Sequence, residues 1–187
     1  WIEDRREHFV ATTQERGQFW QLEIATESDG RIRGVRGVMV HDHGAYTARG
    51  INVAFEAAQT MTMAYQVPAC DLNVKLALTN KVPVTPVRGA GQPQGVFAME
   101  RMLDRVAREL NIDRAELRRR NLVRPDQMPY SKPFKTRSGI PVTIDSGDLP
   151  ASQRAAMQAI AWSDFEQKRR AARQDGRFLG IGLANFV

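Results

Sequence analysis

The segment Val82–Met99, which reads VPVTPVRGAGQPQGVFAM, contains the residues best suited to bind a ligand. Its pattern is typical of a strand, a tight turn at Arg88–Gly91 and a helix that begins at Pro93. In this geometry the backbone amides of the turn and of the helix N-terminus converge on an anion or another electron-rich group. The glycines at 89 and 91 leave no Cβ to hold a ligand away, and the Arg88 guanidinium adds a planar set of donors. Taken alone, the pattern fits equally well a tight turn with a solvated arginine.

Two other groups of residues could do chemistry. Histidines two positions apart on a strand share one face, but no third ligand is visible, so we interpret His41-Asp42-His43 as a polar cluster near a turn. Cys70 is the single cysteine and has no accompanying His–Asp pattern, which favours a small core or edge residue over a nucleophile. One thiol and three histidines exclude a CxxC-type zinc site, and we expect no metal ligands in this chain.

The elements before the turn are predicted to be mainly strands. Trp20, Leu22 and Ile24 alternate with polar neighbours, and the interruption at Asp29-Gly30 predicts a hairpin with a type I′ turn. Alternation over residues 72–78 predicts a further strand that leads toward the turn. Residues 51–65 have mixed spacing and are predicted to be a helix or an irregular segment.

After Pro93 the hydrophobic period becomes helical and runs through Glu109. The predicted apolar stripe comprises Val96, Phe97, Met99, Met102, Leu103, Val106, Ala107 and Leu110. Asp113 caps a short helix that ends near Leu122, and further helices begin near positions 148 and 163. Residues 124–147 are predicted to be an exposed connection with one strand at 140–144. Both chain ends read as strands, and we interpret the chain as a fragment.

Composition excludes several classes of protein. With 187 residues, 42% hydrophobic and 26% charged, the chain is neither disordered nor collagen-like nor a coiled coil. It has no apolar run long enough to cross a bilayer and no signal peptide, so we expect a cytoplasmic location, with the periplasm as the alternative. The net charge is +6. In residues 101–120 the arginines alternate with acids, which indicates a solvated helix face. Arg118–Arg120 is expected to be a solvated helix end, with contact to a partner surface as the alternative.

A series of short motifs recurs in a specific order and spacing. They are Trp1-x-Glu3-Asp4-Arg5-x-Glu7, Asp29-Gly30 followed by Gly44-Ala45-Tyr46, Tyr65-x-x-Pro68, Thr79-Asn80-x-x-Pro83, Arg88-Gly89-x-Gly91-x-Pro93-Gln94, Glu100, Arg118-x-x-Asn121-Leu122 and Ser146-Gly147-Asp148. In this order the chain resembles the molybdenum-cofactor-binding subunit of the xanthine dehydrogenase and aldehyde oxidase family. The resemblance covers nearly the whole chain. It implies an α+β fold of β hairpins and a mixed sheet packed with several helices, with residues 1–187 forming a single segment of the cofactor-binding domain.

The resemblance also implies roles for particular residues. In the family, the Arg-Gly-x-Gly loop approaches molybdenum and the pyranopterin largely through backbone groups. The implied cofactor-binding residues are Val87, Arg88, Gly89 and Gly91. Ala90 and Glu56 would face the substrate, at positions where purine-oxidising members carry an aromatic ring and an arginine. Xanthine is therefore a poor match, and an aldehyde or an N-heteroaromatic compound is implied, although Glu56 equally fits a surface carboxylate.

The family's catalytic glutamate and its other cofactor motifs have no match in these residues. We therefore expect no catalytic residue within this fragment and no activity from it alone. In the full enzyme the resemblance implies oxidation of the substrate with water as the oxygen source. The implied cofactors are molybdenum-molybdopterin in the cytosine dinucleotide form, together with FAD and [2Fe-2S] clusters on partner subunits or domains.

Two alternatives without redox chemistry stay open. A basic nucleic-acid-binding module would use Arg33, Arg36, Arg49 and the helical arginines. A subunit-interaction module would have the same fold but an empty binding turn. The molybdenum hypothesis instead expects a small-molecule substrate, iron–sulfur and flavin partners, no specific nucleic acid and no membrane.

Overall fold

The computed structural model describes residues 1–47 and 49–187. In chain order its helices and strands are α1 (Arg5–Ala11), β1 (Gln18–Thr26), β2 (Ile32–Gly44), α2 (Gly50–Thr60), β3 (Cys70–Leu78), α3 (Gln92–Glu109), α4 (Arg114–Asn121), the 3-10 helix η1 (Pro125–Gln127), β4 (Tyr130–Lys135), β5 (Pro141–Ile144), α5 (Leu149–Ala159), the 3-10 helix η2 (Trp162–Asp164) and α6 (Phe165–Gln174). In the part of the chain so described, no helix is long and apolar enough to cross a membrane.

Three strands form one mixed sheet in the order β1-β2-β3. Strands β1 and β2 pair antiparallel, with Trp20 opposite Met39 and Ile24 opposite Val35. Strand β3 runs parallel to β2, with Cys70 opposite Val35. Parallel neighbours need a crossover connection, and α2 provides it here. The predicted α+β class, with a β hairpin and a mixed sheet, is confirmed.

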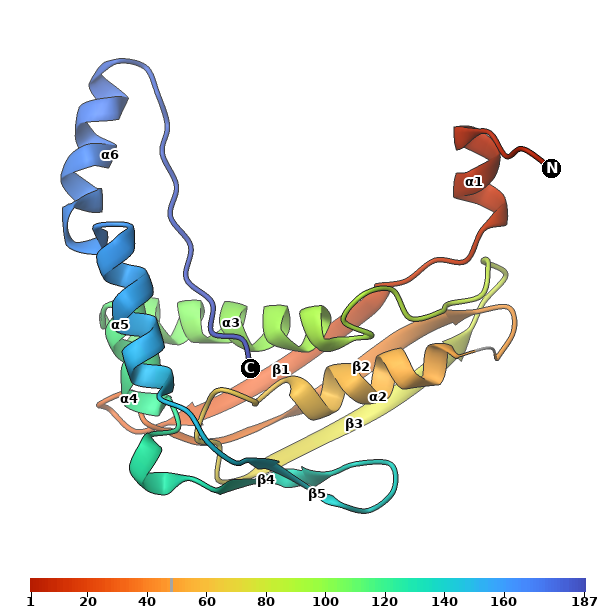
Figure 1. Ribbon diagram of the computed structural model, residues 1–187, viewed down its shortest axis with the longest axis horizontal. Coiled ribbons are helices and arrows are strands. Elements are labelled where there is room, and N and C mark those ends of the chain that lie inside the picture. The colour runs from red at the N-terminus through yellow and green to blue at the C-terminus, as the bar shows by residue number, and fades with distance from the viewer. Residues whose placement is uncertain (48) are drawn as a thin grey trace.

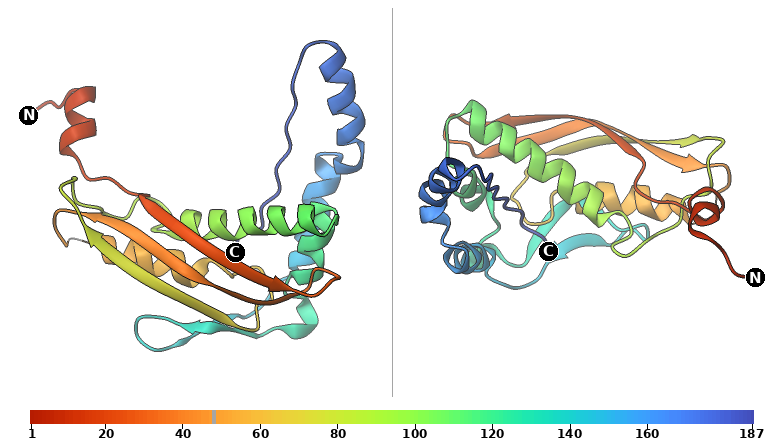
Figure 2. Two further views of the ribbon diagram at one scale, coloured as in Figure 1. Left: turned by 180° about the vertical axis from the view of Figure 1, so that it is seen from behind. Right: turned by 90° about the horizontal axis from the view of Figure 1, so that it is seen from above.

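Helices α2 and α3 cover one face of this sheet, whereas α1 and α6 stand away from it (Figures 1 and 2). Trp20, Leu22 and Ile24 of β1 face the helices, because successive side chains on a strand point to opposite faces. The buried core between the layers comprises Ile32, Val35, Met61, Ala64, Tyr65, Val67, Met99, Leu103, Val106, Ala107, Leu117 and Leu122. The predicted stripe on α3 is therefore right for most of its members, but Phe97 is 68% exposed.

The loop between β1 and β2 differs from the predicted type I′ turn. That turn requires a positive φ at both central residues, and of Asp29 and Gly30 only Gly30 has one, at +84°. Residues 27–31 instead form a longer loop. The Glu27 amide donates to the Arg31 carbonyl at 2.9 Å, and the Arg31 amide donates to the Asp29 carboxylate at 3.0 Å. This side-chain bond stabilises the longer loop in place of the tight turn.

The two chain ends also differ from prediction. Residues 5–11 form α1 rather than a strand, because the Asp4 carboxylate accepts a bond from the Glu7 amide at 2.8 Å and caps the helix. Residues 179–187, expected to be strand-like, have no regular secondary structure. Within the described chain no neighbouring strand pairs with this segment, and a strand without a partner leaves its backbone groups unbonded.

A buried ion pair joins α3 to α4. Arg118 is fully buried, and its Nε donates to Glu100 Oε2 at 2.6 Å. The other Glu100 oxygen accepts bonds from the Tyr65 hydroxyl and from the Asn185 amide in the C-terminal segment. The expectation of a solvated helix end is therefore wrong for Arg118, although it holds for Arg119, which is half exposed and pairs with an acid of its own helix.

The connection after α4 contains more structure than predicted. The expected strand is present as β5, but it pairs antiparallel with β4, which the sequence did not reveal because Pro133 interrupts it. Lys132 of β4 is buried, and its Nζ donates to the carbonyls of Thr62 at 2.7 Å and Tyr65 at 2.5 Å. The hairpin is thereby fastened to the segment that follows α2.

The buried Lys132 should make stability depend on pH. Burial lowers its pKa from 10.5 to about 7. Between these values the unfolded chain holds more protons than the folded one, so the free energy of unfolding should rise with pH, by at most about 1.4 kcal/mol per pH unit. This gain is lost as the pH falls through about 7. Urea titrations from about pH 7 to 8.5 on the wild type and on Lys132→Met measure it, and equal slopes in the two proteins would contradict the expectation.

Candidate functional site

Residues Arg88–Gly91 form a tight turn directly before α3. Three consecutive residues in it have a positive φ: Gly89 at +96°, Ala90 at +47° and Gly91 at +106°. The Ala90 amide donates to the Val87 carbonyl at 2.8 Å, which closes the turn. A positive φ is strained for alanine, and such strain is frequent at ligand-binding sites. The backbone here has the close, tight course that the glycine spacing predicts.

Arg88 is exposed and Gly89 is half-buried, whereas Gly91 is buried, so the turn amides most accessible to a ligand are those of Arg88 and Gly89. No acceptor within residues 1–47 and 49–187 bonds the N–H groups of Arg88, Gly89 or Gly91. The first turn of α3 has fewer free N–H donors, since Pro93 has no N–H and the Gln94 amide donates to the Gly91 carbonyl at 3.1 Å. The groups able to bind an anion or an electron-rich atom therefore lie in the turn itself rather than at the helix N-terminus.

Helix α2 packs behind the turn. A Cβ added to Gly91 would overlap the Val53 carbonyl oxygen and lie 2.8 Å from the Ala57 amide. Glu56 lies between those two positions on α2 and is half buried, as is Ala90. The two residues expected to face a substrate thus come from directly packed elements, and in the described part of the chain Glu56 forms no ion pair.

An arginine far from the turn in sequence reaches it in space. Arg16 Nη2 donates to the Arg88 carbonyl at 3.3 Å, and its Nη1 donates to Gln94 Oε1 at 3.3 Å. The Glu15 carboxylate lies 3.2 Å from Arg16 Nη2 and is fully buried. Sequence reasoning missed this cluster, because no local pattern relates Arg16 to a turn more than 70 positions away. The one available signal was Gln94, a polar residue in the first turn of an otherwise apolar helix face.

His41 and His43 lie side by side on β2 and are both buried, with ring centroids 5.7 Å apart. Gln18 Nε2 contacts His41 Nδ1 at 3.3 Å, and burial lowers the pKa of His41. Asp42 points to the other side of the strand, where hydrogen bonds from Lys81 and Thr79 lower its pKa. Among the residues described, no group of three His, Cys, Asp or Glu could hold a metal ion.

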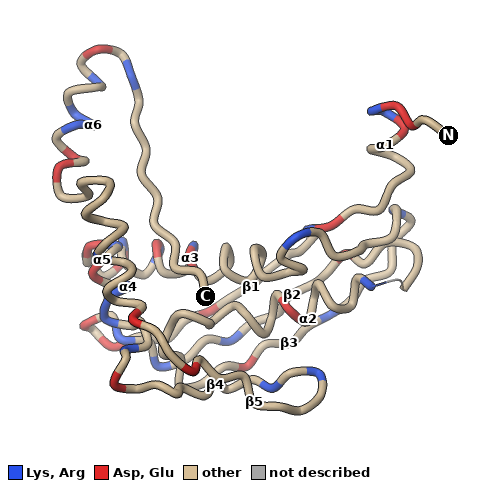
Figure 3. The backbone as a smooth tube through the Cα atoms, viewed as in Figure 1, with Lys and Arg blue, Asp and Glu red and all other residues tan. Residues whose placement is uncertain are grey.

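Over residues 1–47 and 49–187 the basic positions form no continuous track. Basic and acidic positions are interspersed along the chain (Figure 3). Arg33 and Arg36, which a nucleic-acid-binding module would use, lie 3.4 Å from Glu27 and 2.6 Å from Glu23. These acidic neighbours offset the positive charge that would attract a phosphate backbone, so the geometry does not favour this alternative.

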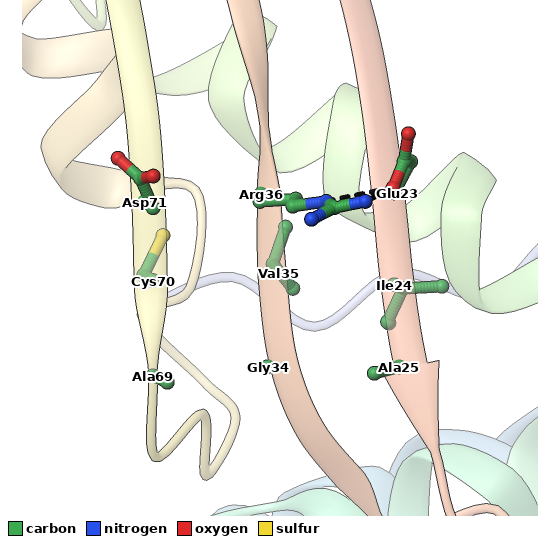
Figure 4. A pocket seen from close by; sticks show the side chains of 9 residues that line it. All are labelled: Glu23, Ile24, Ala25, Gly34, Val35, Arg36, Ala69, Cys70 and Asp71. Carbon is green, nitrogen blue, oxygen red and sulfur yellow. Dashed lines mark hydrogen bonds and ion pairs between the residues drawn. The ribbon is translucent and has the colours of Figure 1, made fainter.

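A cavity of about 420 Å³ lies over the three strands near Gly34 and Cys70 (Figure 4). The cavity is remote from the binding turn at Arg88–Gly91. That turn follows Val84, whose amide donates to the His43 carbonyl, and His43 lies at the opposite end of β2 from Gly34. Burial raises the pKa of the Cys70 thiol to about 11, so this thiol is not an activated nucleophile. The half-buried Cys70 packs against the core, as predicted.

Comparison with known proteins places the chain in a family. The family model described as "Molybdopterin cofactor-binding domain" matches residues 1–122. The nicotine 6-hydroxylase large subunit of Paenarthrobacter nicotinovorans is 34% identical over the whole chain and 22% of its own length. The carbon monoxide dehydrogenase large chain of Hydrogenophaga pseudoflava is 33% identical over the whole chain and 23% of its length.

Among solved structures, quinoline 2-oxidoreductase from Pseudomonas putida 86 has a TM-score of 0.84 at 30% identity. The match covers the whole of this chain and 23% of that one. The chain therefore spans less than a quarter of the length of the relatives that it matches.

Proposed function

Because this chain belongs to the molybdopterin cofactor-binding domain family, we propose that it forms one wall of the molybdopterin site in a longer oxidoreductase. Its membership confirms the resemblance that the ordered motifs indicate, and its α+β fold matches a cofactor-binding enzyme of this family. We propose further that residues 1–187 are a single segment of that domain. In that case the catalytic base and the remaining cofactor contacts lie elsewhere, and the segment alone is inactive.

The observation that carries the proposal is the turn at Arg88–Gly91. Its unbonded amides fit a bulky, anionic cofactor, because they offer several donors at once, although the missing Cβ atoms of Gly89 and Gly91 make room for Pro93 and for α2 and not for a ligand. Val87 and Arg88 are exposed at this turn, and the Arg88 side chain supplies a planar set of donors. We assign cofactor binding to Val87, Arg88, Gly89 and Gly91.

When bound, the molybdenum cofactor supplies a two-electron oxidation with water as the oxygen source. The contribution of this chain is to hold the cofactor through backbone amides and to shape the adjoining substrate pocket. Ala90 places only a methyl group beside that pocket, and Glu56 places a carboxylate near it. A small group leaves room for a planar ring, which fits an N-heteroaromatic compound or an aldehyde. The names of two relatives, a nicotine hydroxylase and a quinoline oxidoreductase, support this choice.

The same proposal implies partners. We propose that electrons leave through [2Fe-2S] clusters and FAD on partner subunits or domains, and that the pterin carries a cytosine dinucleotide. A relative described as the large chain of carbon monoxide dehydrogenase supports an assembly of several chains. Such an enzyme would be cytoplasmic or periplasmic.

Metal and pterin analysis of the full-length protein, purified with its native partners, tests the function. We expect about one molybdenum per chain and pterin fluorescence after denaturation. Arg88→Ala should reduce cofactor content or turnover about tenfold, since a hydrogen bond to a charged group is worth roughly 1.5 kcal/mol or more. The control is Arg169→Ala, which removes an exposed arginine of α6 whose one ion-pair partner among the described residues is Glu166. Absence of molybdenum and pterin from the wild type would refute the proposal.

A further inference from the structure

The Arg16 guanidinium contacts three groups, of which the Arg88 carbonyl belongs to the binding turn. It donates to the Arg88 carbonyl and to the Gln94 side chain, each at 3.3 Å, and lies 3.2 Å from the Glu15 carboxylate. Within the described residues, the Arg88 carbonyl accepts no other hydrogen bond. Arg16 precedes β1, so it bonds the turn from a segment that belongs neither to the turn nor to α3.

Holding this carbonyl fixes the direction of an amide. The peptide between Arg88 and Gly89 is planar, and in a trans peptide the carbonyl and the N–H point in opposite directions. Because the Arg88 carbonyl points to Arg16, the Gly89 N–H points away from Arg16, where no described residue accepts it. Glycine tolerates both signs of φ, so without this contact the peptide could rotate at little cost.

The surroundings hold Arg16 in place. Its own φ is +85°, which is rare for arginine, so the surrounding contacts must stabilise it. The Glu15 carboxylate is buried and makes no hydrogen bond in the described chain, which leaves Arg16 as its compensating charge. Gln94 is also buried, and its Oε1 is bonded to Arg16.

We propose that Arg16 is a positioning residue, which fixes the Arg88–Gly89 peptide so that the Gly89 amide is aimed at the bound cofactor. Arg16 does not itself contact the cofactor in this arrangement. The inference rests on the proposed function, because the Gly89 amide has a cofactor to bind only if that function holds. It adds Arg16 to the cofactor site as the residue that sets the geometry of the turn.

The test uses Arg16→Lys in the full-length protein with its native partners. Lysine keeps the charge beside Glu15 but loses the planar fork that reaches two acceptors at once. We expect unchanged thermal unfolding, about tenfold faster pterin release in mild denaturant, and an altered molybdenum EPR spectrum of the reduced protein. The EPR change separates positioning from a merely structural role. Arg33→Lys, at the far end of β2, is the matched control and should behave as the wild type.

A second variant keeps the test valid if Arg16→Lys fails to fold. Glu15→Gln with Arg16→Gln removes both charges together, so no buried carboxylate is left without a partner. It should show the same pterin release and EPR change. If the wild type holds pterin and the folded variants match it in release rate and spectrum, the inference is wrong while the proposed function stands. If the wild type holds no pterin, the proposed function fails and this inference fails with it.

Discussion

Replacing Arg118 by methionine should lower the free energy of unfolding by about 3–5 kcal/mol, because it leaves a buried carboxylate without its partner. Arg118 is fully buried and bonds Glu100 Oε2 at 2.6 Å and Asp104 Oδ1 at 2.9 Å. Burial opposes its charge, yet the Glu100 carboxylate raises its pKa, so the guanidinium stays protonated in the folded chain. Urea denaturation followed by circular dichroism measures the loss.

Arg119→Met is the matched control, one position along the same helix. Arg119 is half exposed and pairs with Glu116 on the surface, so its loss should cost about 0.5 kcal/mol or less. A double variant, Glu100→Leu with Arg118→Met, should be more stable than the sum of the single losses predicts, since it removes both buried charges. If Arg118→Met lowers the free energy of unfolding no more than Arg119→Met does, the prediction that the unpaired Glu100 carboxylate destabilises the fold is wrong.

The contrast between Arg118 and Arg119 shows where sequence reasoning ends. Both lie in the run Arg118–Arg120, whose mixed charges and helical spacing indicate a solvated face. Which of them turns inward depends on the packing of α4 against α3 and on Glu100, 18 positions earlier. A local charge pattern does not report a contact between two helices, so a buried ion pair and a surface ion pair look alike in the sequence.

The elements that were predicted correctly are those fixed by local periodicity. The hairpin of β1 and β2 follows from alternation, and α3 follows from its apolar stripe and from Pro93. Strand β4 was missed because Pro133 breaks the usual strand pattern, although pairing with β5 and the bonds of Lys132 hold it. The helix α1 was missed because its apolar residues, at positions 9–11, are consecutive and so form no stripe at helical spacing.

The candidate site divides in the same way. The turn at Arg88–Gly91 was recognised because the spacing of the glycines indicates the local backbone conformation. The participation of Arg16 was not, since it depends on a contact across more than 70 residues. The roles assigned to Glu56 and Ala90 stay predictions, which substitutions at these positions in the full enzyme would test.

Replacing Gly91 by alanine should be among the most damaging single changes, with a loss of about 3–5 kcal/mol in the free energy of unfolding. The new Cβ would overlap the Val53 carbonyl oxygen and approach the Ala57 amide to 2.8 Å. Both atoms belong to the backbone of α2, which cannot move aside as a flexible side chain would. The positive φ of +106° adds a strain of about 1–2 kcal/mol. Urea denaturation of the chain measures the total.

Gly139→Ala separates the two causes of this loss. Gly139 has a positive φ of +84°, but a Cβ there would meet nothing within 4 Å. Its substitution should therefore cost only the backbone strain, about 1–2 kcal/mol, and the difference between the two variants reports the close packing of the turn on α2. Equal losses would mean that the turn can move away from α2. The spacing between Glu56 and the binding turn would then not be fixed by Gly91, and the shape assigned to the substrate pocket would lose its support.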